Sequence, residues 1–523
     1  MNRAPLSVLA AVTALAAITG IAALTAPGDR ADGAGAKAPA RLPVERAGLL
    51  CPSVGHSEGA KTTYTSFTPP TPEPADGTDG NRPAVRPGTA ELRPAGAPFP
   101  APERKPAPDK APAAVPGTDD GPRRAEPVLA LKAPGTPVAV PAPGGDAPAL
   151  VGTATAALAP GWTAQQTTVL PNGRARALLG AACTAPGTDF WFPGASTAKG
   201  RQDYLHLVNP DDTPAVADIE ILGRDGRVRG TLPDGLPVPA GAGLPVLLST
   251  LTAEELPDAT VRVTTRTGRV GAVVRTAEDG AGGDWLAASA APSATVVMPG
   301  IPADATSVRL VVLAPGDADA ELRAGLASPG GTFGLVGHET VRVKAGMTTA
   351  VELGDITRGE PGSLVLRPAE PGRATPVVAA LKIVRGTGKG RETAHIPATG
   401  PVGDRASAVD NRATGTTLSL TAPYWAARVR VTASTGTEGG TPAVREYRIA
   451  AGTTAAVTPP VPAGLKGSYA LTVETVSGGP VHASRTLALP RGGVAMFTIQ
   501  TLPDDHGTVS VPTARRELSV LDD

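Results

Sequence analysis

The stretch Val238-Pro-Ala-Gly241 lies between two apolar runs, and the chain repeats it as Val343-Lys-Ala-Gly346 and Ile449-Ala-Ala-Gly452. The final glycines of these stretches are 105 and 106 residues apart. Glycine is the residue that most easily adopts the positive φ angles of tight turns. A turn repeated at this period indicates duplicated β-domains of about 100 residues each.

Further turn residues recur in the same order within each repeat. They are Gly226, Gly331 and Gly440, then Gly268, Gly372 and Gly479, and the prolines that we expect to open each unit, Pro193, Pro299 and Pro397. Between the turns, apolar residues alternate with polar or small ones, as in Ile219 and Ile221 or Val429 and Val431. This alternation is typical of half-buried strands. The sequence therefore predicts an all-β fold of tandem immunoglobulin-like antiparallel β-sandwich domains.

A degenerate first copy is predicted upstream of the three clear ones. The stretch Val138–Gly144 resembles the Val238 turn and places Gly144 97 residues before Gly241, while Gln166–Leu179 resembles the Arg262–Val274 hairpin. We expect these boundaries: 1–28 for a signal peptide or signal anchor, 42–190 for the first β-domain, 191–297, 298–395 and 405–505 for three sandwiches, and 506–523 for a C-terminal tail.

A proline-rich insert interrupts the first copy. Residues 69–126 hold 15 prolines in 58 positions and few branched aliphatic residues. Such a segment buries too little apolar area to offset its ordering entropy, so we expect a disordered spacer, with a wall-spanning or partner-binding role as the alternative. The stretch Thr62–Phe67 reads as a strand before the insert, and it must pair with strands after it.

The N-terminus carries an export signal. Leu6–Leu24 is an uncharged apolar run of 19 residues that follows Arg3 and precedes Asp29 and Arg30. The run nearly reaches the length of a membrane span, and Leu24-Thr25-Ala26 is a poor cleavage site, so a cleaved signal and an uncleaved membrane anchor both stay open. A buried core helix is the other reading. Either signal places the chain outside the cytoplasm, secreted or membrane-anchored.

Cys51 and Cys183 are the only cysteines. An even number of cysteines after an export signal favours a disulfide between them, with two buried free thiols as the alternative. The bond would tie the strand before the insert to the body after it. A redox enzyme is disfavoured because the chain has no Cys-x-x-Cys motif.

Composition argues against nucleic acid as a partner. Lysine plus arginine equal aspartate plus glutamate at 48 each, so the chain has no overall positive field. The 63 glycines and 57 prolines fit the predicted turns and spacer.

Candidate sites for metals and catalysis are weak, and we expect no cofactor. The six histidines are His56, His206, His338, His395, His482 and His506, and no two of them have the spacing of metal ligands. Asp317, Asp319 and Glu321 would share one strand face, where calcium binding competes with a plain solvated surface. Arg385–Gly390 superficially resembles a phosphate loop, but it lacks the following Ser or Thr and a helix, so we expect a flexible inter-domain loop. No serine sits in a Gly-x-Ser-x-Gly motif.

Two aromatic clusters stand out because aromatic residues make up only 3% of the chain. Phe190-Trp-Phe192 follows Cys183, so we expect it to pack against the disulfide and a seam between the first two domains. Tyr424-Trp425 follows Pro423 between two strand runs, which predicts a loop tip and a candidate contact for a ligand or partner.

Five motifs together resemble an uncharacterised family of secreted proteins from high-GC Gram-positive bacteria. They are Leu50-Cys-Pro52, Ala159–Gln166, Ala182–Pro186, Asp189–Gly194 and Leu207–Pro210. The resemblance covers nearly the whole chain and implies an envelope location and an association with polysaccharide-building glycosyltransferases. It supplies no catalytic residues.

Repetition without a catalytic constellation indicates a non-enzymatic envelope protein that presents interaction surfaces to other envelope proteins or to cell-surface polysaccharide. A carbohydrate-binding protein of the cell wall is the alternative, and a cell-wall hydrolase or its accessory is the third hypothesis.

Overall fold

A computed structural model describes residues 40–55, 59–70, 86–96, 126–142, 147–171, 176–230, 235–491 and 493–511. These residues form antiparallel strands and three short 3₁₀ turns, without an α-helix among them, which confirms the predicted all-β class. The predicted N-terminal signal helix lies outside the described residues. Within the described part of the chain, no helix has the length and apolar character needed to cross a membrane.

The chain divides into two compact units. In the smaller, which combines residues 1–42 and 508–523, the described strands β1 (Ala40–Pro43) and β38 (Thr508–Val511) pair with each other. The larger unit, residues 43–507, holds eight principal sheets, which we group into four sheet pairs.

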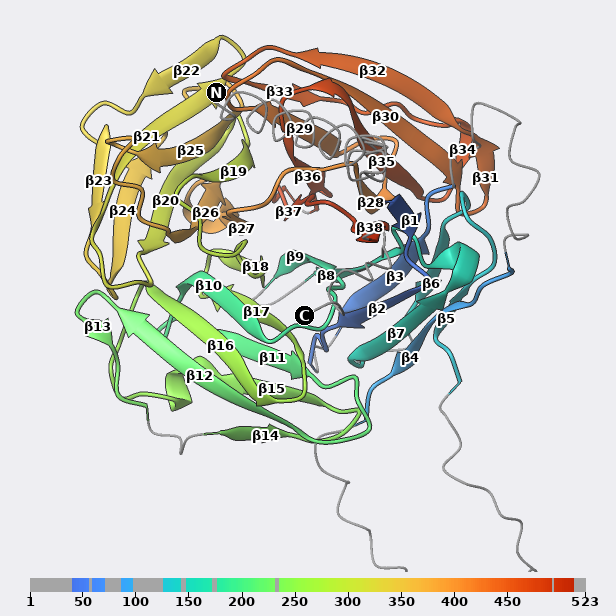
Figure 1. Cartoon of the computed structure of the whole chain (residues 1–523), viewed down its shortest axis with the longest axis horizontal. Helices are drawn as coiled ribbons and strands as arrows, with labels where there is room; N and C mark the ends of the chain where they lie inside the picture. Colours follow the sequence, from blue (N-terminus) through green and yellow to red (C-terminus); the bar gives the residue numbers. More distant parts are fainter. Residues whose placement is uncertain are drawn as a thin grey trace, which may run out of the picture. The chain divides into compact units, whose positions relative to one another are not determined.

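The strands of the sheet pairs follow one another along the chain (Figure 1). The first pair contains β2 (Arg46–Cys51), β3 (Lys61–Phe67), β4 (Ala90–Pro94), β5 (Leu129–Leu131), β6 (Val138–Pro141), β7 (Leu150–Thr155), β8 (Thr163–Leu170) and β9 (Ala177–Ala182). The second contains β10 (Asp189–Ala195), β11 (Tyr204–Val208), β12 (Ala215–Gly223), β13 (Gly226–Arg227), β14 (Leu236–Val238), β15 (Gly243–Leu247), β16 (Ala259–Thr267), β17 (Gly271–Glu278) and β18 (Gly282–Leu286).

The third pair contains β19 (Val296–Ile301), β20 (Ala305–Leu313), β21 (Ala320–Ser328), β22 (Gly331–Gly334), β23 (Thr340–Val343), β24 (Thr348–Gly354), β25 (Gly362–Pro368), β26 (Val378–Arg385) and β27 (Glu392–Pro397). The fourth contains β28 (Arg405–Asn411), β29 (Thr416–Ala422), β30 (Ala427–Gly436), β32 (Ala443–Ile449), β33 (Thr453–Val457), β35 (Tyr469–Gly478), β36 (His482–Ala488) and β37 (Phe497–Thr501), beside a small sheet of β31 (Gly439–Thr441) and β34 (Ala463–Lys466). The 3₁₀ turns are η1 (Ala156–Leu158), η2 (Leu248–Thr250) and η3 (Gly388–Gly390).

All four sheet pairs share one strand order. In the first pair one sheet runs β2-β7-β4-β5 and the other runs β6-β3-β8-β9. The fourth pair repeats this order as β28-β35-β30-β32 and β33-β29-β36-β37, and the second and third pairs follow it with the fourth strand position split in two. Each core cluster draws buried side chains from both sheets of its pair, which gives a β-sandwich-like arrangement.

The recurring turn glycines occupy equivalent places. Gly241, Gly346 and Gly452 have φ angles of +61°, +69° and +72°. Each donates its backbone N–H over 2.8 Å to the carbonyl of Asp211, Ala314 or Ala422, which lies at or shortly after the end of the second strand of its pair. An L side chain would be strained at these φ values, which explains why the turn keeps glycine.

Gly135, and not Gly144, is the equivalent glycine in the first pair. Gly135 has φ +82° and donates to Thr68 O at 2.8 Å, and it precedes Gly241 by 106 residues. The alignment through Gly144 is therefore wrong, because Val138–Pro141 forms the strand after this turn. The hairpin comparison is wrong for the same reason: β8 occupies the seventh strand position, whereas β16 occupies the sixth.

The proline-rich segment contains a strand, which corrects the prediction of disorder throughout 69–126. β4 pairs with both β5 and β7, and Ala90 and Leu92 are buried in the core. The alternation Ala90-Glu91-Leu92-Arg93 is a short strand pattern that the surrounding prolines hide in an average over the segment. The predicted strand Thr62–Phe67 is confirmed as β3, which pairs downstream with β6 and β8.

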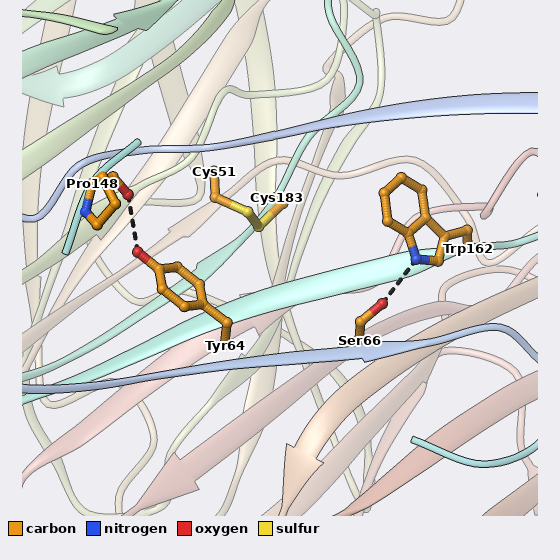
Figure 2. Close-up of a disulfide and its surroundings, with 6 residues drawn as sticks. All are labelled: Cys51, Tyr64, Ser66, Pro148, Trp162 and Cys183. Atoms are coloured by element: carbon orange, nitrogen blue, oxygen red, sulfur yellow. Dashed lines mark hydrogen bonds between the residues drawn. A yellow bond between two sulfur atoms is a disulfide. The ribbon is translucent and has the colours of Figure 1, made fainter. Parts of the chain in front are cut away.

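The predicted disulfide between Cys51 and Cys183 is present (Figure 2). It joins β2 to the segment after β9, and it closes a sequence separation of 132 residues that includes the insert. Tyr64 on β3 donates to Pro148 O at 2.9 Å and Trp162 donates to Ser66 Oγ at 2.8 Å, so the polar ends of these two core aromatic side chains are satisfied.

Within the larger unit the last strands of the four pairs meet. β9 contacts β18, β18 contacts β27, β27 contacts β37, and β37 contacts β9, so the contacts close a cycle (Figure 1). Side chains cross these boundaries into neighbouring cores: Trp285 joins the first core, and Phe497 and Ile499 join the third. The sheet pairs therefore pack against one another and are not independent units joined only by linkers.

Two predicted boundary features differ from expectation. Pro193 and Pro299 lie in β10 and β19, the first strands of their pairs, but Pro397 ends β27, the last strand of the third pair. The loop at 385–390 connects the hairpin strands β26 and β27 within one sheet, so its interpretation as an inter-domain loop is wrong.

Candidate functional site

Tyr424 and Trp425 lie in the connection between β29 and β30. Their exposed fractions are 37% and 63%, and their rings form an edge-to-face pair with centroids 5.7 Å apart. The predicted loop tip is confirmed. Their role as a ligand or partner contact stays a prediction.

Three loops gather at this end of the fourth sheet pair. Gly452 N donates to Ala422 O at 2.8 Å, and Gly479 N donates to Ala426 O at 3.2 Å. These bonds bring together residues 423–426, 450–453 and 476–481, which we call the three-loop surface. The three segments contain no charged residue. The surface can therefore offer aromatic faces, hydroxyls and backbone groups, but no charge.

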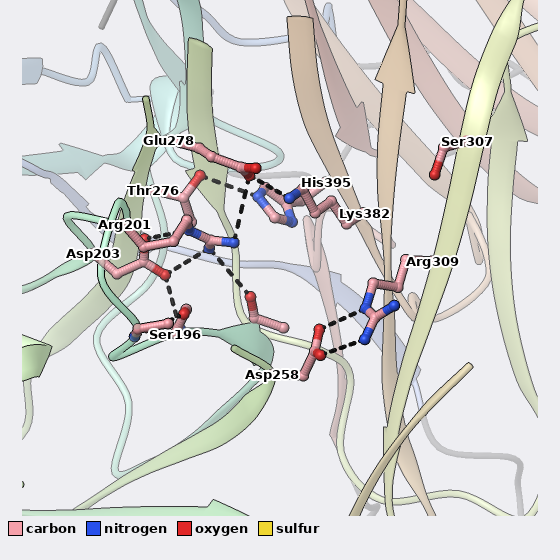
Figure 3. Close-up of polar contacts among 12 residues, drawn as sticks. Ser196, Arg201, Asp203, Asp258, Thr276, Glu278, Ser307, Arg309, Lys382 and His395 are labelled. Atoms are coloured by element: carbon pink, nitrogen blue, oxygen red, sulfur yellow. Dashed lines mark hydrogen bonds and ion pairs between the residues drawn. The ribbon is translucent and has the colours of Figure 1, made fainter. Parts of the chain in front are cut away.

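A polar seam joins the second and third sheet pairs (Figure 3). Arg201 binds Asp203 at 2.7 Å, and Asp203 also accepts the Ser196 N–H at 2.9 Å. Glu278 on β17 lies 3.8 Å from Arg201 and pairs with Lys382 on β26. Arg309 on β20 contacts Asp258 at 2.6 Å. Two of these ion pairs, Glu278–Lys382 and Asp258–Arg309, connect the second sheet pair to the third.

The pKa shifts of the seam follow from its geometry. Burial disfavours the charged form of Glu278, but Lys382 and Arg201 outweigh it and lower the pKa of this carboxyl. Burial opposes charge on Arg201 too, yet Asp203 and Glu278 keep the pKa of the guanidinium raised. Glu278 and Arg201 are therefore ionised at neutral pH. Burial raises the pKa of Asp203 despite its contact with Arg201.

Asp284 lies where three last strands meet. Its carboxyl accepts bonds from Trp285 N at 2.8 Å, from Gly180 N on β9 at 3.3 Å and from Thr498 Oγ1 on β37 at 2.9 Å. Complete burial raises the pKa of Asp284 well above its usual value. Gly180 has to be small here, because an added Cβ would lie 2.6 Å from Thr498 Cγ2. Sequence analysis missed Asp284, because a carboxyl in a strand such as Gly282–Leu286 is ordinarily exposed.

Arg485 joins the first and fourth sheet pairs. It is fully buried on β36 and donates to Gln165 Oε1 on β8 at 2.6 Å, to Val409 O at 3.2 Å, and to Gln500 Oε1. Burial lowers the pKa of the guanidinium to about 10, so it keeps its charge at neutral pH. Sequence analysis gave no signal for Arg485, because an arginine within a strand is ordinarily exposed.

Three of the six histidines are buried or nearly so. His206 is 4% exposed beside Trp285, and neither ring nitrogen has a hydrogen-bond partner in the described structure. His395 bonds Thr276 Oγ1 at 3.0 Å, and His482 Nδ1 bonds Thr399 O at 3.0 Å. His338 and His506 lie elsewhere, and His56 is outside the described residues. Among the residues that the structure describes, no three His, Cys, Asp or Glu side chains are grouped to hold a metal.

We expect acid to destabilise the fold through His206. Burial, together with Arg275, lowers the pKa of its imidazole to about 3. This folded-state pKa lies below the unfolded value of about 6.5, so the unfolded chain binds the proton first as pH falls. The contribution of the neutral imidazole to the free energy of unfolding is therefore complete above pH 6.5 and falls by about 2 kcal/mol between pH 6.5 and 5. Denaturant unfolding of the wild type and His206→Phe across this range should show a shallower pH slope for the variant. Equal slopes would contradict a neutral buried imidazole.

The cluster Phe190–Phe192 does not pack as expected. Phe192 is buried in the second core, and Trp191 packs against Leu313 and Val378 of the third sheet pair, with Arg262 over its ring at 4.4 Å. The predicted seam with the first domain and the disulfide is therefore wrong. The reason is that alternate residues of β10 face opposite sides, toward the second core and toward the third sheet pair.

The other predicted motifs do not form sites. Asp317 and Asp319 lie in the connection before β21 and not on a strand face with Glu321, whose carboxylate pairs with Arg342 at 3.1 Å. In the loop at 385–390, Gly386 and Gly388 have φ angles of +76° and +54°, which serve a hairpin turn. Ser196 donates to Leu256 O at 2.9 Å, with no histidine among its partners.

Comparison with known families adds a classification. Residues 138–460, more than half of the chain, match a family described as "Family of unknown function (DUF5719)". The chain belongs to the DUF5719 family. No curated protein matches the chain. The resemblance to an uncharacterised family is confirmed to this extent.

The DUF5719 match begins in β6 and ends between β33 and β34. It thus contains the second and third sheet pairs entirely, together with Cys183 and the Tyr424–Trp425 loop. Cys51, the proline-rich insert and residues 476–481 lie outside it. The family segment therefore includes two of the three loops of the three-loop surface, and it reaches into both flanking sheet pairs.

Proposed function

We propose that this chain is a non-enzymatic protein of the cell envelope of high-GC Gram-positive bacteria. Secreted or held by its N-terminal segment at the membrane, it presents interaction surfaces to other envelope proteins and takes part in cell-surface polysaccharide assembly. The observation that carries the proposal is the Cys51–Cys183 disulfide, whose half-cystines are 0% and 6% exposed. Structural disulfides of this kind belong to oxidising, extracytoplasmic compartments.

A binding role is supported over catalysis by where the perturbed titratable groups lie. Asp284, His395 and Arg485 are enclosed at contacts between sheet pairs, and their bonds go to protein atoms across those contacts. A reactant would have to separate the sheet pairs to reach them. Perturbed pKa values also arise in structural networks, and this enclosure favours that origin.

We further propose that the sheet pairs are four immunoglobulin-like domains, which correspond to the segments 42–190, 191–297, 298–395 and 405–505 once the ends are moved by a few residues to keep β10, β19 and β27 whole. In the second pair β10, β16 and β12 pair as immunoglobulin strands B, E and D do, and β11, β17 and β18 pair as C, F and G do. A duplicated domain of this kind is a common framework for surface loops.

A second candidate is a carbohydrate-binding protein of the cell wall. It is favoured by one observation, the 63% exposure of Trp425 in a chain whose other tryptophans, Trp162, Trp191 and Trp285, are buried. A large exposed aromatic side chain on a loop is a common contact for ligands.

The envelope proposal is tested in the native host. Intact cells are treated with a membrane-impermeant amine label, and the protein is then alkylated under denaturing conditions with and without reductant. We expect surface labelling, and cysteine alkylation only after reduction. An unlabelled protein with two free thiols would contradict the proposal, and hydrolysis of wall polymers by the purified protein would overturn its non-enzymatic part.

A further inference from the structure

The second, third and fourth sheet pairs can be compared at the connection between their second and third strands, which joins β11 to β12, β20 to β21 and β29 to β30. In the second pair it carries Asp211 and Asp212, in the third it carries Asp317 and Asp319, and in the fourth it carries Tyr424 and Trp425. The backbone bond from the turn glycine to this connection is 2.8 Å in each. The fold therefore does not require aromatic side chains at this position.

The contacts of this connection also differ in chemistry. Asp211 pairs with Arg269 at 3.0 Å, and Asp319 O accepts the Thr375 hydroxyl at 2.9 Å. In the fourth pair Trp425 lies against Gly479 instead, where an added Cβ would be 2.7 Å from Trp425 Cβ and 3.2 Å from Cε3. A residue without a side chain thus seats one side of Trp425, while 63% of the residue is exposed.

Exposure of this indole is not explained by stability. Apolar area left in water forgoes the stabilisation that its burial would give, and the equivalent connections of the second and third pairs use polar side chains. Aromatic residues exposed together on a loop mark a contact surface.

We propose that the three-loop surface binds an uncharged glycan chain of the cell surface. This inference rests on the second candidate function and names its site and ligand class. The three loops hold no charge, which disfavours anionic polymers and charged peptides. The C–H face of a sugar ring packs on an aromatic face, and the indole N–H, the Tyr424 hydroxyl and the exposed Ser477 can meet sugar hydroxyls.

The shape of the surface fits a stacked chain rather than an enclosed small molecule. A cavity of about 150 Å³ lies elsewhere, along β12 with Asp218, Glu220 and Arg227 in its lining. Trp425 and Tyr424 instead protrude at a loop tip. A polymer can pass over such a tip without having to fit a pocket.

The test uses envelope polysaccharide extracted from the source organism and split by anion exchange into uncharged and anionic fractions. Binding of the full mature chain to each fraction is measured by affinity electrophoresis. We expect the uncharged fraction to bind, Trp425→Ala to raise the half-saturating concentration at least about tenfold, and Trp425→Asp, which installs the side-chain type of the other sheet pairs, to abolish binding. Val444→Ala is the control, because this residue is 60% exposed in the same sheet pair but pairs with Thr432 at the end of β32 away from the three loops, and it should bind as wild type.

The remaining outcomes separate this inference from the function it rests on. If Trp425→Ala binds the uncharged fraction as well as wild type does, the proposed site is wrong, but the carbohydrate-binding function is retained. Binding of the anionic fraction alone would overturn the ligand class. Failure of both fractions, with a protein trapped by a photocrosslinker at position 425, would overturn both and leave protein binding as the role. Unchanged thermal midpoints of the variants would verify their folding.

Discussion

Replacing Cys51 and Cys183 together by serine is expected to lower the free energy of unfolding of the first sheet pair by about 5 kcal/mol. The bond spans 132 residues, and a cross-link over a loop of this length removes much of the conformational freedom of the unfolded chain. The insert lengthens the loop but adds few buried residues. Closing this long loop costs conformational entropy that the burial of β4 alone does not offset, so the disulfide is needed as well.

Guanidinium unfolding followed by tryptophan fluorescence includes a signal from the first pair, since Trp162 and Trp285 are both buried in its core. Limited proteolysis gives a second readout, because cuts in the insert should leave the two halves joined only while the bond is intact. Reductant should shift the wild-type midpoint to that of the double variant and leave the variant unchanged. A double variant as stable as the oxidised wild type would mean that strand pairing by β3 and β4 suffices.

The turn glycines made the repeated architecture predictable. Glycine at a positive φ is nearly obligatory, so Gly241, Gly346 and Gly452 stay in place while the strands around them change. The first copy was misaligned because Leu131-Lys-Ala-Pro-Gly135 carries one more residue than Val343-Lys-Ala-Gly346. Gly268, Gly372 and Gly479 show the limit of such patterns, since only Gly268 of the three has a positive φ.

Packing between sheet pairs was not predictable from local patterns. A strand pattern tells which residues alternate, but not that the second face of β10 meets the third sheet pair through Trp191. The same holds for Asp284, which looks like any strand carboxylate until Gly180 and Thr498 are seen to close over it. The exposed Trp425 was predictable because its loop is local, fixed by Pro423 and the ends of two clear strands.

Replacing Arg485 by alanine is expected to lower the free energy of unfolding by about 3 to 5 kcal/mol. The change leaves a cavity, and it strips the acceptors Gln165 Oε1, Gln500 Oε1 and Val409 O of their donor in a buried place. Arg445→Ala is the matched control in the same sheet pair. That arginine is exposed over the Tyr447 ring at 5.4 Å, so we expect a loss below about 1 kcal/mol.

A double-mutant cycle asks whether Arg485 couples the fourth sheet pair to the first. Gln165→Ala should be costly in the wild type and much less so beside Arg485→Ala, with a coupling energy of about 1 to 3 kcal/mol measured by denaturant unfolding. The coupling arises because the arginine on β36 and the glutamine on β8 meet across the boundary between the fourth and first sheet pairs, where β37 contacts β9 and β28 contacts β8. If the losses of the two single variants simply add, the first and fourth sheet pairs do not contact each other through these residues in solution, and each is stabilised by its own core.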